Sequence, residues 1–389
     1  MSAALRVAEV FRAGWEEYDR TQRVAPHQRH AVRHILACRT AALGGHLFRC
    51  ETCGKELPVY NSCQSRHCPT CQTSAKEKWL AARRAELLPV RYFHSVFTLP
   101  HSLNGLVDAN RRLLLGELFG VVNWVLQAFA HDPQWRLEGE LGFLAILHTW
   151  TRRLQEHFHV HCIVPGGVWQ AQRRRWVSRR GKWLFRKDSL AKAFRRRFLG
   201  RLVALRSAGK LVFTGAAAPL AEEARWKELL HDLERVKWVV YHKHADGGAE
   251  KVLDYLGRYT HRVAISDHRL VRLVEGQVTY RWRDRNDGNR EKLDTLPVQE
   301  FIRRFLYHVL PDGFPKIRYY GWLASANKET LLPLIRAALQ ALPPPFAPQE
   351  SLAERVLRLT GVDLRLCPFC GQGRLVKTLM RILPVRGPP

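Results

Sequence analysis

The placement of the cysteines constrains this chain more than any other feature of its sequence. Eight of the nine cysteines lie toward the two ends, and six of those eight form C-x-x-C pairs. In CETCGKELPVYNSCQSRHCPTC, Cys50 and Cys53 form one pair and Cys68 and Cys71 the next. Two turns that each present two thiolates are typical of a tetrahedral zinc site. Because the segment is poor in apolar residues, it needs a metal ion to fold, and we expect these four cysteines to bind one zinc ion.

Other candidate ligands surround this segment. Cys63 and His67 are spare donors within the same segment, and Cys38 and His46 lie just upstream of it. Any of them could replace one of the four cysteines or help to hold a second ion. The pair Cys367 and Cys370, in CPFCGQGRL, is half of such a zinc site and must find two partners elsewhere in the chain.

The charge of the chain indicates its partner. Lys and Arg number 63 and Asp and Glu 35, which gives a formal net charge of +28 and a pI near 10.4 over 389 residues. An excess of this size is typical of a protein that binds phosphate-rich molecules. We expect nucleic acid and not a membrane, because we find no apolar run of about 18 residues and no signal-peptide pattern. Cysteines spaced as metal ligands, and not as a disulfide framework, favour a reduced cytoplasmic protein.

Alternating histidines mark one strand. The stretch HFHVHCIVPGG predicts a strand that is stopped by Pro-Gly-Gly. Residues two apart in a strand face the same way, so His159 and His161 project together while Val160 and Cys162 point into the core. Two adjacent imidazoles can chelate one divalent ion, and the alternative is a pair of polar residues on a solvated face. His157 lies on the same face at the start of the strand.

A helix farther along the chain carries two tyrosines. In AEKVLDYLGRYTHRV the apolar and aromatic residues recur at helical spacing, which places Tyr255 and Tyr259 on one face, one turn apart. The alternative is an aromatic stripe packed against a sheet. Arg258 and Arg262 flank the phenols, and guanidinium groups at such positions favour phenolate and hold phosphoryl oxygens. The pattern therefore suits chemistry on phosphate.

These residues resemble those of a known family. HVH in a strand, followed by paired tyrosines in YLGRYTHRVAIS, is similar to the HUH (His-hydrophobic-His) rolling-circle nucleases. The chain resembles more closely the two-tyrosine transposases of the insertion-sequence ninety-one family. The matching stretches run in order along most of the chain: ACRTAALGGH, YNSCQSRHCPTCQ, VFTLPH, HTW, HFHVHCIVPGG, WVVY, YLGRYTHRVAIS, FIRRFLYHVLPDGFPKIRYYG and CPFCG.

The resemblance implies a fold and a function. The fold class is α+β, with a helical, zinc-ribbon-like DNA-binding domain over residues 1–88. A catalytic domain with an HUH-type antiparallel sheet and helices follows over residues 89–325, and a helical tail with the last cysteine pair over residues 326–389. The implied function is that of a rolling-circle transposase in the bacterial cytoplasm, associated with the nucleoid. It would cleave and rejoin single-stranded DNA at the ends of the element through a 5′-phosphotyrosine intermediate.

The resemblance also implies roles for particular residues. His159 and His161 would bind catalytic Mg²⁺ or Mn²⁺, Tyr255 and Tyr259 would be the nucleophiles, and zinc would be structural. A third polar ligand of the catalytic ion is usual in these enzymes. Its candidates are His148, Glu156 and His261.

Basic residues mixed with aromatic ones, as in RRRWVSRRGKWLFR, suit stacking on unpaired bases, and the alternative is a solvated basic face. We expect DNA contacts from these arginines: Arg173, Arg174, Arg175, Arg179, Arg180, Arg258 and Arg262. Two other functions stay open. A zinc-containing DNA-binding regulator without catalysis explains the charge and the cysteines but leaves HVH and YLGRY as coincidences. A metal-dependent hydrolase that uses water needs the histidines but not the tyrosines.

Overall fold

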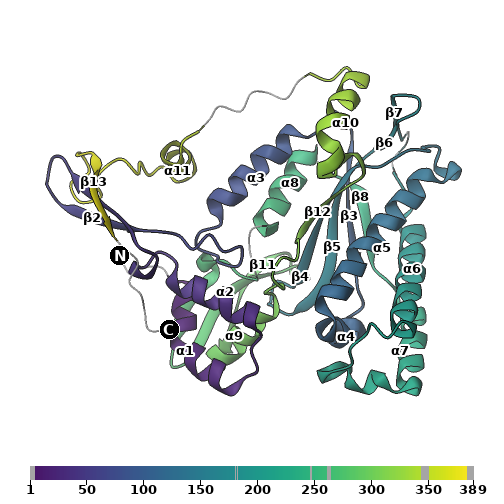
Figure 1. Cartoon of the computed structure of the whole chain (residues 1–389), viewed down its shortest axis with the longest axis horizontal. Helices are drawn as coiled ribbons and strands as arrows, with labels where there is room; N and C mark the ends of the chain where they lie inside the picture. Colours follow the sequence, from purple (N-terminus) through teal and green to yellow (C-terminus); the bar gives the residue numbers. More distant parts are fainter. Residues whose placement is uncertain are drawn as a thin grey trace. The chain divides into compact units, whose positions relative to one another are not determined.

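Strands from distant parts of the sequence pair with one another in this chain, and this pairing sets its division into units. The computed structural model describes residues 5–179, 181, 183–245, 248–260, 264–342 and 350–382 (Figure 1). Unit 1 consists of Met1–Trp79, His261–Val309 and Pro345–Pro389, and unit 2 of Leu80–Thr260 and Leu310–Pro344. The domain boundaries expected from the sequence, at residues 88 and 325, stay a prediction, and each of the two units is assembled from separated stretches of the chain.

The core of unit 2 is a five-stranded antiparallel sheet with the strand order β12-β4-β5-β3-β8. Its strands are β3 (Tyr92–Thr98), β4 (Phe143–Trp150), β5 (Glu156–Pro165), β8 (Val240–His244) and β12 (Ile317–Tyr320). β-Branched and aromatic residues, which favour strands, fill much of them. β4 and β5 form a hairpin, and its turn is closed by a hydrogen bond from the N–H of Thr151 to the carbonyl of Gln155 (2.8 Å).

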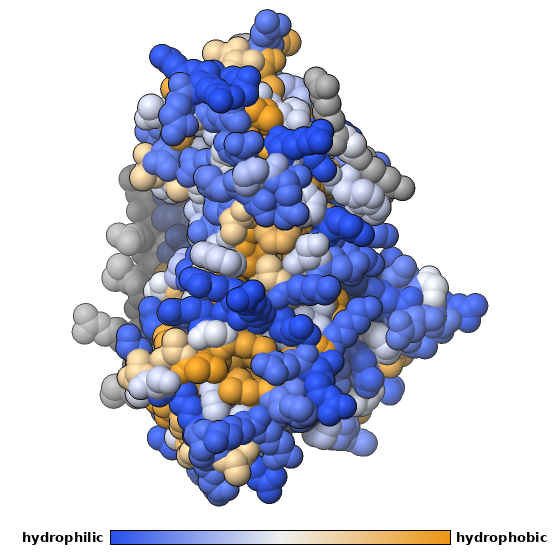
Figure 2. All heavy atoms as spheres, turned by 90° about the vertical axis from the view of Figure 1, so that its right-hand side faces the viewer, coloured by the Kyte–Doolittle hydropathy of each residue, from blue (hydrophilic) through white to orange (hydrophobic). Residues whose placement is uncertain are grey.

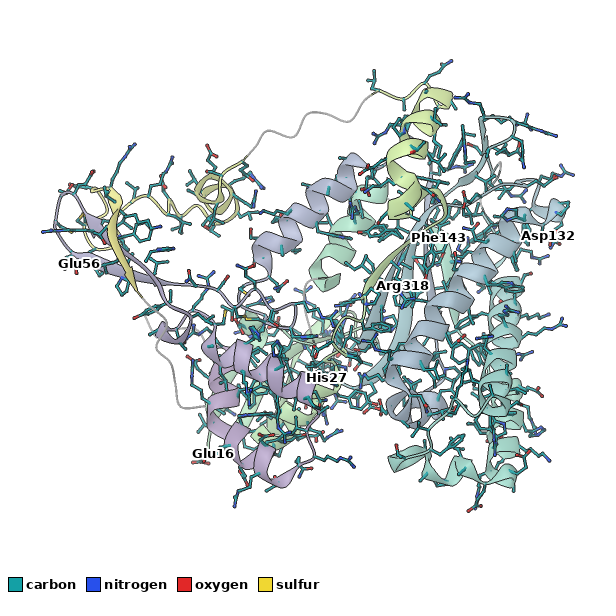
Figure 3. All side chains as sticks on the ribbon, viewed as in Figure 1. Glu16, His27, Glu56, Asp132, Phe143 and Arg318 are labelled. Atoms are coloured by element: carbon teal, nitrogen blue, oxygen red, sulfur yellow. The ribbon has the colours of Figure 1, made fainter. Side chains whose placement is uncertain are left out.

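Helices cover both faces of this sheet (Figure 1). One face is covered by α4 (Asn104–Ala109), α5 (Arg111–His131) and α6 (Lys187–Ser207). On that face, the ring of Phe97 packs against Phe194 of α6 with centroids 5.3 Å apart. Arg318, labelled in Figure 3, lies there too, with its guanidinium 4.3 Å from the ring centroid of Phe119. The opposite face is covered by α8 (Gly248–Thr260) and the part of α3 (Thr73–Ala85) that belongs to unit 2.

Helix α5 is the one helix in the described ranges that is long and apolar enough to cross a membrane. Leu114, Leu118, Val122 and Val125 of this helix are fully buried. Burial against the sheet accounts for the apolar composition of α5, as it does for the core helix of many folds. Unit 2 also contains α7 (Glu223–Arg235), α10 (Ser325–Ala338) and the hairpin of β6 (Gly167–Gln170) and β7 (Arg175–Ser178). Figure 2 views the side of α6 and α7, where hydrophilic residues dominate and apolar side chains show between them.

Unit 1 contains two three-stranded antiparallel sheets, with the orders β13-β1-β2 and β11-β10-β9. Their strands are β1 (Gly45–Cys50), β2 (Glu56–Tyr60), β9 (Leu270–Val274), β10 (Gln277–Asp284), β11 (Arg290–Pro297) and β13 (Leu375–Ile382). The helices are α1 (Val7–Thr21), α2 (Pro26–Ala37), α9 (Val298–Tyr307) and α11 (Leu352–Thr360). Phe11 of α1 packs against Phe305 of α9 with ring centroids 5.3 Å apart. The α+β class with antiparallel sheets, expected from the sequence, is confirmed.

The start of β4 depends on a close approach between backbone and ring. A Cβ atom on Gly142 would lie 2.3 Å from the indole of Trp322, which is fully buried. We expect Gly142→Ala to lower the free energy of unfolding by about 1–3 kcal/mol, because the ring must move within a packed core. Chemical denaturation of the purified protein measures this change.

Gly120→Ala is the matched control for this variant. Gly120 lies in α5 with open space around its Cα, so alanine there should leave stability unchanged or raise it by up to about 1 kcal/mol through helix propensity. Equal effects of the two substitutions would contradict the packing of Trp322 on Gly142.

Candidate metal sites and the histidine-bearing face

Three buried imidazoles meet on one face of the unit 2 sheet. His159 and His161 lie on the same face of β5, and His148 of β4 is paired directly opposite His159. Their candidate ligand nitrogens all lie within 4.8 Å of one another, and the three residues are only 5%, 8% and 6% exposed in the order His148, His159, His161. The structure thus brings one of the three candidate third ligands, His148, to the predicted pair. The sheet face that carries these residues is called the histidine-bearing face below.

Hydrogen bonds hold two of these rings through the same nitrogen. Nδ1 of His159 lies 2.8 Å from the carbonyl oxygen of His157, so its N–H donates to that oxygen. Nδ1 of His161 lies 2.8 Å from Nε2 of His94, a residue of β3 on the same face. Nε2 is therefore the nitrogen that each ring can offer to a metal, and a partner on the other nitrogen fixes the ring orientation as in known metal sites.

The environment favours neutral imidazole. Burial, followed by the neighbouring His161 and His159, lowers the pKa of His148 well below its usual value. Neutral imidazole is the form that binds metals, because the nitrogen lone pair must be free of a proton. The three rings are close enough to offer one nitrogen atom each to a single metal ion.

The other candidate ligands lie elsewhere or cannot be placed. Glu156 stands at the start of β5, where Oε2 accepts a hydrogen bond from Nδ2 of Asn104 (3.4 Å), and it is outside the group of three histidines. His157 is also outside that group; its Nδ1 lies 3.3 Å from Nε2 of His101, and burial together with His101 lowers the pKa of His157 to about 4. His261 falls outside the described residues.

Helix α8, which contains Tyr255 and Tyr259, lies on the histidine-bearing face and contacts β3 and β5 (Figure 1). Its position is set by α3: a Cβ on Gly257 would lie 2.7 Å from the side chain of Leu80, and Asp254 pairs with Arg84. The side chains of Tyr255, Arg258 and Tyr259 lie outside the described part of the structure, as do Arg180 and Arg262 entirely.

The cysteines group differently from the single site expected from their spacing. Cys68 and Cys71 gather with Cys38 and Cys63, whereas Cys50 and Cys53 gather with Cys367 and Cys370. The hairpin of β1 and β2 is the reason. Cys50 ends β1 at the turn of the hairpin. The open end, where Gly45 pairs with Tyr60 and from which the chain continues to Cys68, is five residues or about 16 Å away at about 3.3 Å per residue. A zinc–sulfur bond of about 2.3 Å cannot bridge that distance, so the expected set Cys50, Cys53, Cys68 and Cys71 is corrected to two separate sets.

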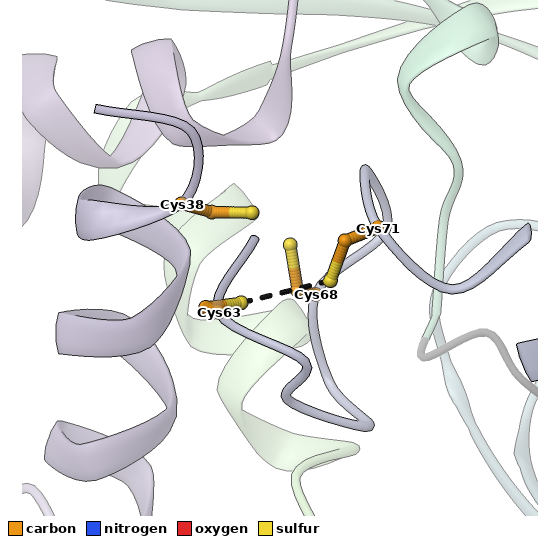
Figure 4. Close-up of side chains that lie close together, drawn as sticks. All are labelled: Cys38, Cys63, Cys68 and Cys71. Carbon is orange, nitrogen blue, oxygen red and sulfur yellow. Dashed lines mark hydrogen bonds between the residues drawn. The ribbon is translucent and has the colours of Figure 1, made fainter. Parts of the chain in front are cut away.

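Cys38, Cys63, Cys68 and Cys71 converge near the end of α2 (Figure 4). The sulfurs of Cys63 and Cys71 lie 3.7 Å apart. Four sulfurs at about 2.3 Å from one zinc ion would be separated by about 3.8 Å, so the observed spacing fits a tetrahedral zinc site. His67 is buried but does not belong to either group of cysteines. Cys38 was named from the sequence as a candidate replacement ligand, because it lies just upstream of the cysteine-rich segment.

The candidate DNA-binding arginines divide into exposed and structural ones. Arg173, Arg174 and Arg175 are exposed at the turn between β6 and β7. Arg179 instead donates from Nη1 to the carbonyl of Trp135 (2.9 Å) and lies 5.9 Å from the centroid of that ring. Arg175 donates from Nε to Oε1 of Gln170 (2.9 Å), so Arg173 and Arg174 are the exposed arginines of the turn that can contact phosphate, whereas Arg179 is occupied within the fold.

Comparison with known proteins identifies the class. Residues 142–330 match the family model described as "Putative transposase", and residues 10–99 match the one described as "Transposase zinc-binding domain". These matches indicate a transposase in which a zinc-binding domain precedes the sheet that carries the histidines.

Two relatives match this chain over most of their own length. The chain is 43% identical over 390 residues to "Putative transposase y4qJ" of Sinorhizobium fredii, covering 98% of this chain and 97% of the relative. It is 28% identical over 372 residues to "Transposase for insertion sequence element IS801" of Pseudomonas savastanoi pv. phaseolicola, covering 92% of this chain and 85% of that protein. The chain belongs to the insertion-sequence ninety-one family of transposases, so its partner is DNA. No solved structure matches it.

The exposed arginines of the β6–β7 turn lead to a testable contrast. We expect Arg174→Ala to leave stability within about 0.5 kcal/mol of the parent but to weaken binding to a single-stranded oligonucleotide. The slope of log affinity against log salt should fall by about one, as expected for one lost phosphate contact. Fluorescence anisotropy at several salt concentrations measures both quantities.

Arg179→Ala should do the reverse and lower the free energy of unfolding by about 1–2 kcal/mol with little change in salt slope. Gln172→Ala, on the same exposed turn, is the uncharged control. An unchanged salt slope in Arg174→Ala would exclude this turn from the DNA interface.

Proposed function

We propose that this transposase works by a rolling-circle mechanism, cleaving and rejoining single-stranded DNA through tyrosines of α8. The observation that carries the proposal is the group of three buried histidines on the sheet face over which α8 lies. A DNA-binding regulator without catalysis would need no such group, because burying three imidazoles gains nothing for binding DNA. We keep it as the alternative that the experiments below exclude or support.

The histidines fit the divalent ion that this family implies. Three imidazoles offer ligand atoms within 4.8 Å of one another, and two of them have their Nδ1 atoms engaged by His157 and His94. Nitrogen donors without a carboxylate among them favour Mn²⁺ over the harder Mg²⁺. When bound, such an ion would polarise a phosphate oxygen and orient the phosphorus for in-line attack. A structural zinc site has four protein ligands, whereas a catalytic one has three. The three histidines would therefore leave positions on the ion open for substrate.

The tyrosines supply the nucleophile in this proposal. The phenol oxygen of Tyr255 or Tyr259 forms a bond to phosphorus, the phenol proton is lost, and the 3′ oxygen of the neighbouring nucleotide leaves and takes up a proton. The product is a phosphotyrosine at the 5′ end, which keeps the energy of the phosphodiester for rejoining. The two tyrosines are four residues apart, or about 6 Å along the helix axis, so only one phenol can be in line with a given phosphate. The second phenol serves a second cleavage.

The substrate in this proposal is unpaired DNA. A phosphodiester within a duplex is hard to place between a strand and a helix, whereas a single strand can enter such a site. The net charge of +28 and the exposed arginines of the β6–β7 turn supply attraction for the backbone. Such attraction is shared by any nucleic acid, so the selection of single strands comes from the shape of the site.

Structural zinc belongs to the same proposal. Cys38, Cys63, Cys68 and Cys71 would hold one zinc ion, with the 3.7 Å separation of two of their sulfurs matching the edge of a tetrahedral site. This ion would fix the loop 61–72 to the end of α2. The loop is poor in apolar residues and needs such a cross-link.

The role of His148 is the sharpest test of the metal site. We expect His148→Ala to abolish cleavage of a single-stranded oligonucleotide taken from the flank of the element. The affinity for Mn²⁺, followed by electron paramagnetic resonance, should fall by at least the roughly 10- to 100-fold seen when a supporting partner of a ligand is lost. Oligonucleotide binding should persist, because the basic surface is unchanged.

His231→Ala is the control, since His231 lies exposed on α7, away from the sheet. Cleavage by His148→Ala at the parent rate would remove this residue from the active site. Loss of cleavage with unchanged Mn²⁺ affinity would instead assign His148 a purely structural role.

Tyrosine-to-phenylalanine variants test the nucleophiles. We expect Tyr255→Phe and Tyr259→Phe each to retain some cleavage, and the double variant to form no covalent adduct. Phenylalanine keeps the ring and removes only the nucleophilic oxygen. Adducts that survive denaturation are counted on a gel with a fluorescent oligonucleotide.

Tyr241→Phe is the matched control, because Tyr241 is an exposed tyrosine of β8 on the histidine-bearing face. It should form adducts at the parent level. Adduct formation by the double variant would return both helix tyrosines to a packing role, and complete loss in Tyr241→Phe would move the nucleophile to β8.

A further inference from the structure

The second group of cysteines joins the two ends of the chain. Cys50 ends β1 and Cys53 lies in the turn that follows, whereas Cys367 and Cys370 lie just before β13. Their four sulfurs lie within 4.8 Å of one another. The sulfur atoms of Cys50 and Cys370 lie 3.7 Å apart, as do those of Cys53 and Cys367. These distances are close to the roughly 3.8 Å between two sulfurs of a tetrahedral zinc–thiolate site.

The backbone around each pair forms the same kind of turn. The N–H of Cys53 donates to the sulfur of Cys50 (3.4 Å), and the N–H of Gly373 donates to the sulfur of Cys370 (3.3 Å). The turns are closed by N–H groups of Gly54 and Gly371, which donate to the carbonyls of Cys50 and Cys367 (3.0 and 2.9 Å). Both glycines have positive φ, +67° and +71°, which glycine adopts at little cost. Two like turns therefore face each other with N–H groups aimed at sulfur, an arrangement that stabilises thiolate charge.

Strand pairing carries the tail to this position. β13 is antiparallel to β1, with Leu375 opposite Cys50 and Val376 opposite Arg49. The N–H of Glu51 donates to the carbonyl of Arg374 (3.0 Å), which extends the pairing into the turn. A Cβ atom on Gly373 would lie only 2.3 Å from the sulfur of Cys50, so the two turns are in direct contact.

Packing of apolar side chains does not account for this contact. In the described part of the three-stranded sheet and its turns, Val59, Phe369 and Val376 are 42%, 52% and 46% exposed. Cys50 and Cys367, in contrast, are each only 1% exposed. Cys50 and Cys367 are thus the buried residues of this small sheet, with Cys370 half-buried and Cys53 exposed beside them, as in small domains that a metal ion holds together. A disulfide is not formed, because its sulfurs would be about 2.05 Å apart.

We propose that Cys50, Cys53, Cys367 and Cys370 bind a second structural zinc ion, which closes a zinc ribbon built from both ends of the chain. Half of its ligands lie outside residues 10–99, the range matched by the transposase zinc-binding domain. The tail over residues 350–382 is then a part of the zinc-binding unit and not an appendage. This inference does not depend on the proposed reaction, since the four cysteines belong to unit 1 and the three histidines to unit 2.

Zinc content of the full-length protein tests the proposal. Elemental analysis should find about two zinc ions per chain in the parent and about one in Cys370→Ser. Cys68→Ser should also retain about one, because it disrupts only the other group, and the double variant should retain none. Cys162→Ser is the control, since Cys162 lies buried in β5 outside both groups and should leave the zinc content unchanged.

A second variant perturbs the site without removing a ligand. Gly373→Ala pushes a methyl group against the sulfur of Cys50, so one of the two ions should be lost to a chelator that leaves both in the parent. Gln372→Ala, at the exposed neighbouring position, should behave as the parent. Cobalt substitution adds a spectroscopic readout: the tetrathiolate absorption should fall by about half in Cys370→Ser.

Three results would overturn the proposal. One is a zinc content of one ion per chain in the parent protein and the same content in Cys370→Ser. Another is chelator resistance in Gly373→Ala equal to that of the parent. The last is a chain mass, measured without reductant, that shows loss of thiol hydrogens at these four cysteines and no second zinc. None of these results bears on DNA cleavage, so a failed zinc ribbon and a failed catalytic proposal are distinguishable.

Discussion

The register between β4 and β5 is the constraint on which the candidate active site depends. Opposed residues of an antiparallel pair share a face, so pairing His148 with His159 brings two imidazoles together. His161 joins them because residues two apart in a strand point to the same face. A slip of one residue would turn His159 and His161 toward the face that α5 and α6 cover, and would bring Val160 and Cys162 out of it. The short hairpin turn from Thr151 to Gln155 and the full burial of Val160 and Cys162 oppose that slip.

Burial of the histidines has a cost that the surrounding residues offset. A polar group buried without a partner costs about 1–3 kcal/mol in proteins, so three buried imidazoles need hydrogen bonds. The carbonyl of His157 and the ring of His94 provide two of these bonds, both to Nδ1. The same bonds that stabilise the fold therefore leave Nε2 for a ligand. Helix α8 is held over this face by Leu80 and Arg84 of α3, so two segments distant from the histidine strand determine what approaches it.

The sequence predicted the features that depend on neighbouring residues better than those that depend on contacts between distant segments. The histidine strand and the tyrosine helix follow from periods of two and about 3.6 residues, which act within a few residues. Pairing of cysteines into sites is different, because a C-x-x-C motif defines a turn but not its partner. A hairpin of two short strands was enough to move Cys50 and Cys53 away from Cys68 and Cys71, and their partners came from about 314 residues farther along the chain. His94 was missed for the same reason: its importance depends on the pairing of β3 with β5, which no local pattern specifies.

The donor atoms suggest how one chain could keep structural and catalytic metals apart. Under the proposed assignments, four soft thiolates surround each structural ion and complete its coordination, so no position is left for substrate. The histidine site offers nitrogen from three rings only and leaves the remaining positions to water and phosphate oxygen. Release of a thiolate-bound zinc ion would unfold the segment that it holds, which is the loop 61–72 for one set and the turns of the small sheet for the other, and this cost opposes transfer of the ion to the histidines. The thiolate sets of unit 1 and the imidazole set of unit 2 would thus separate the ions by the chemistry of their ligands.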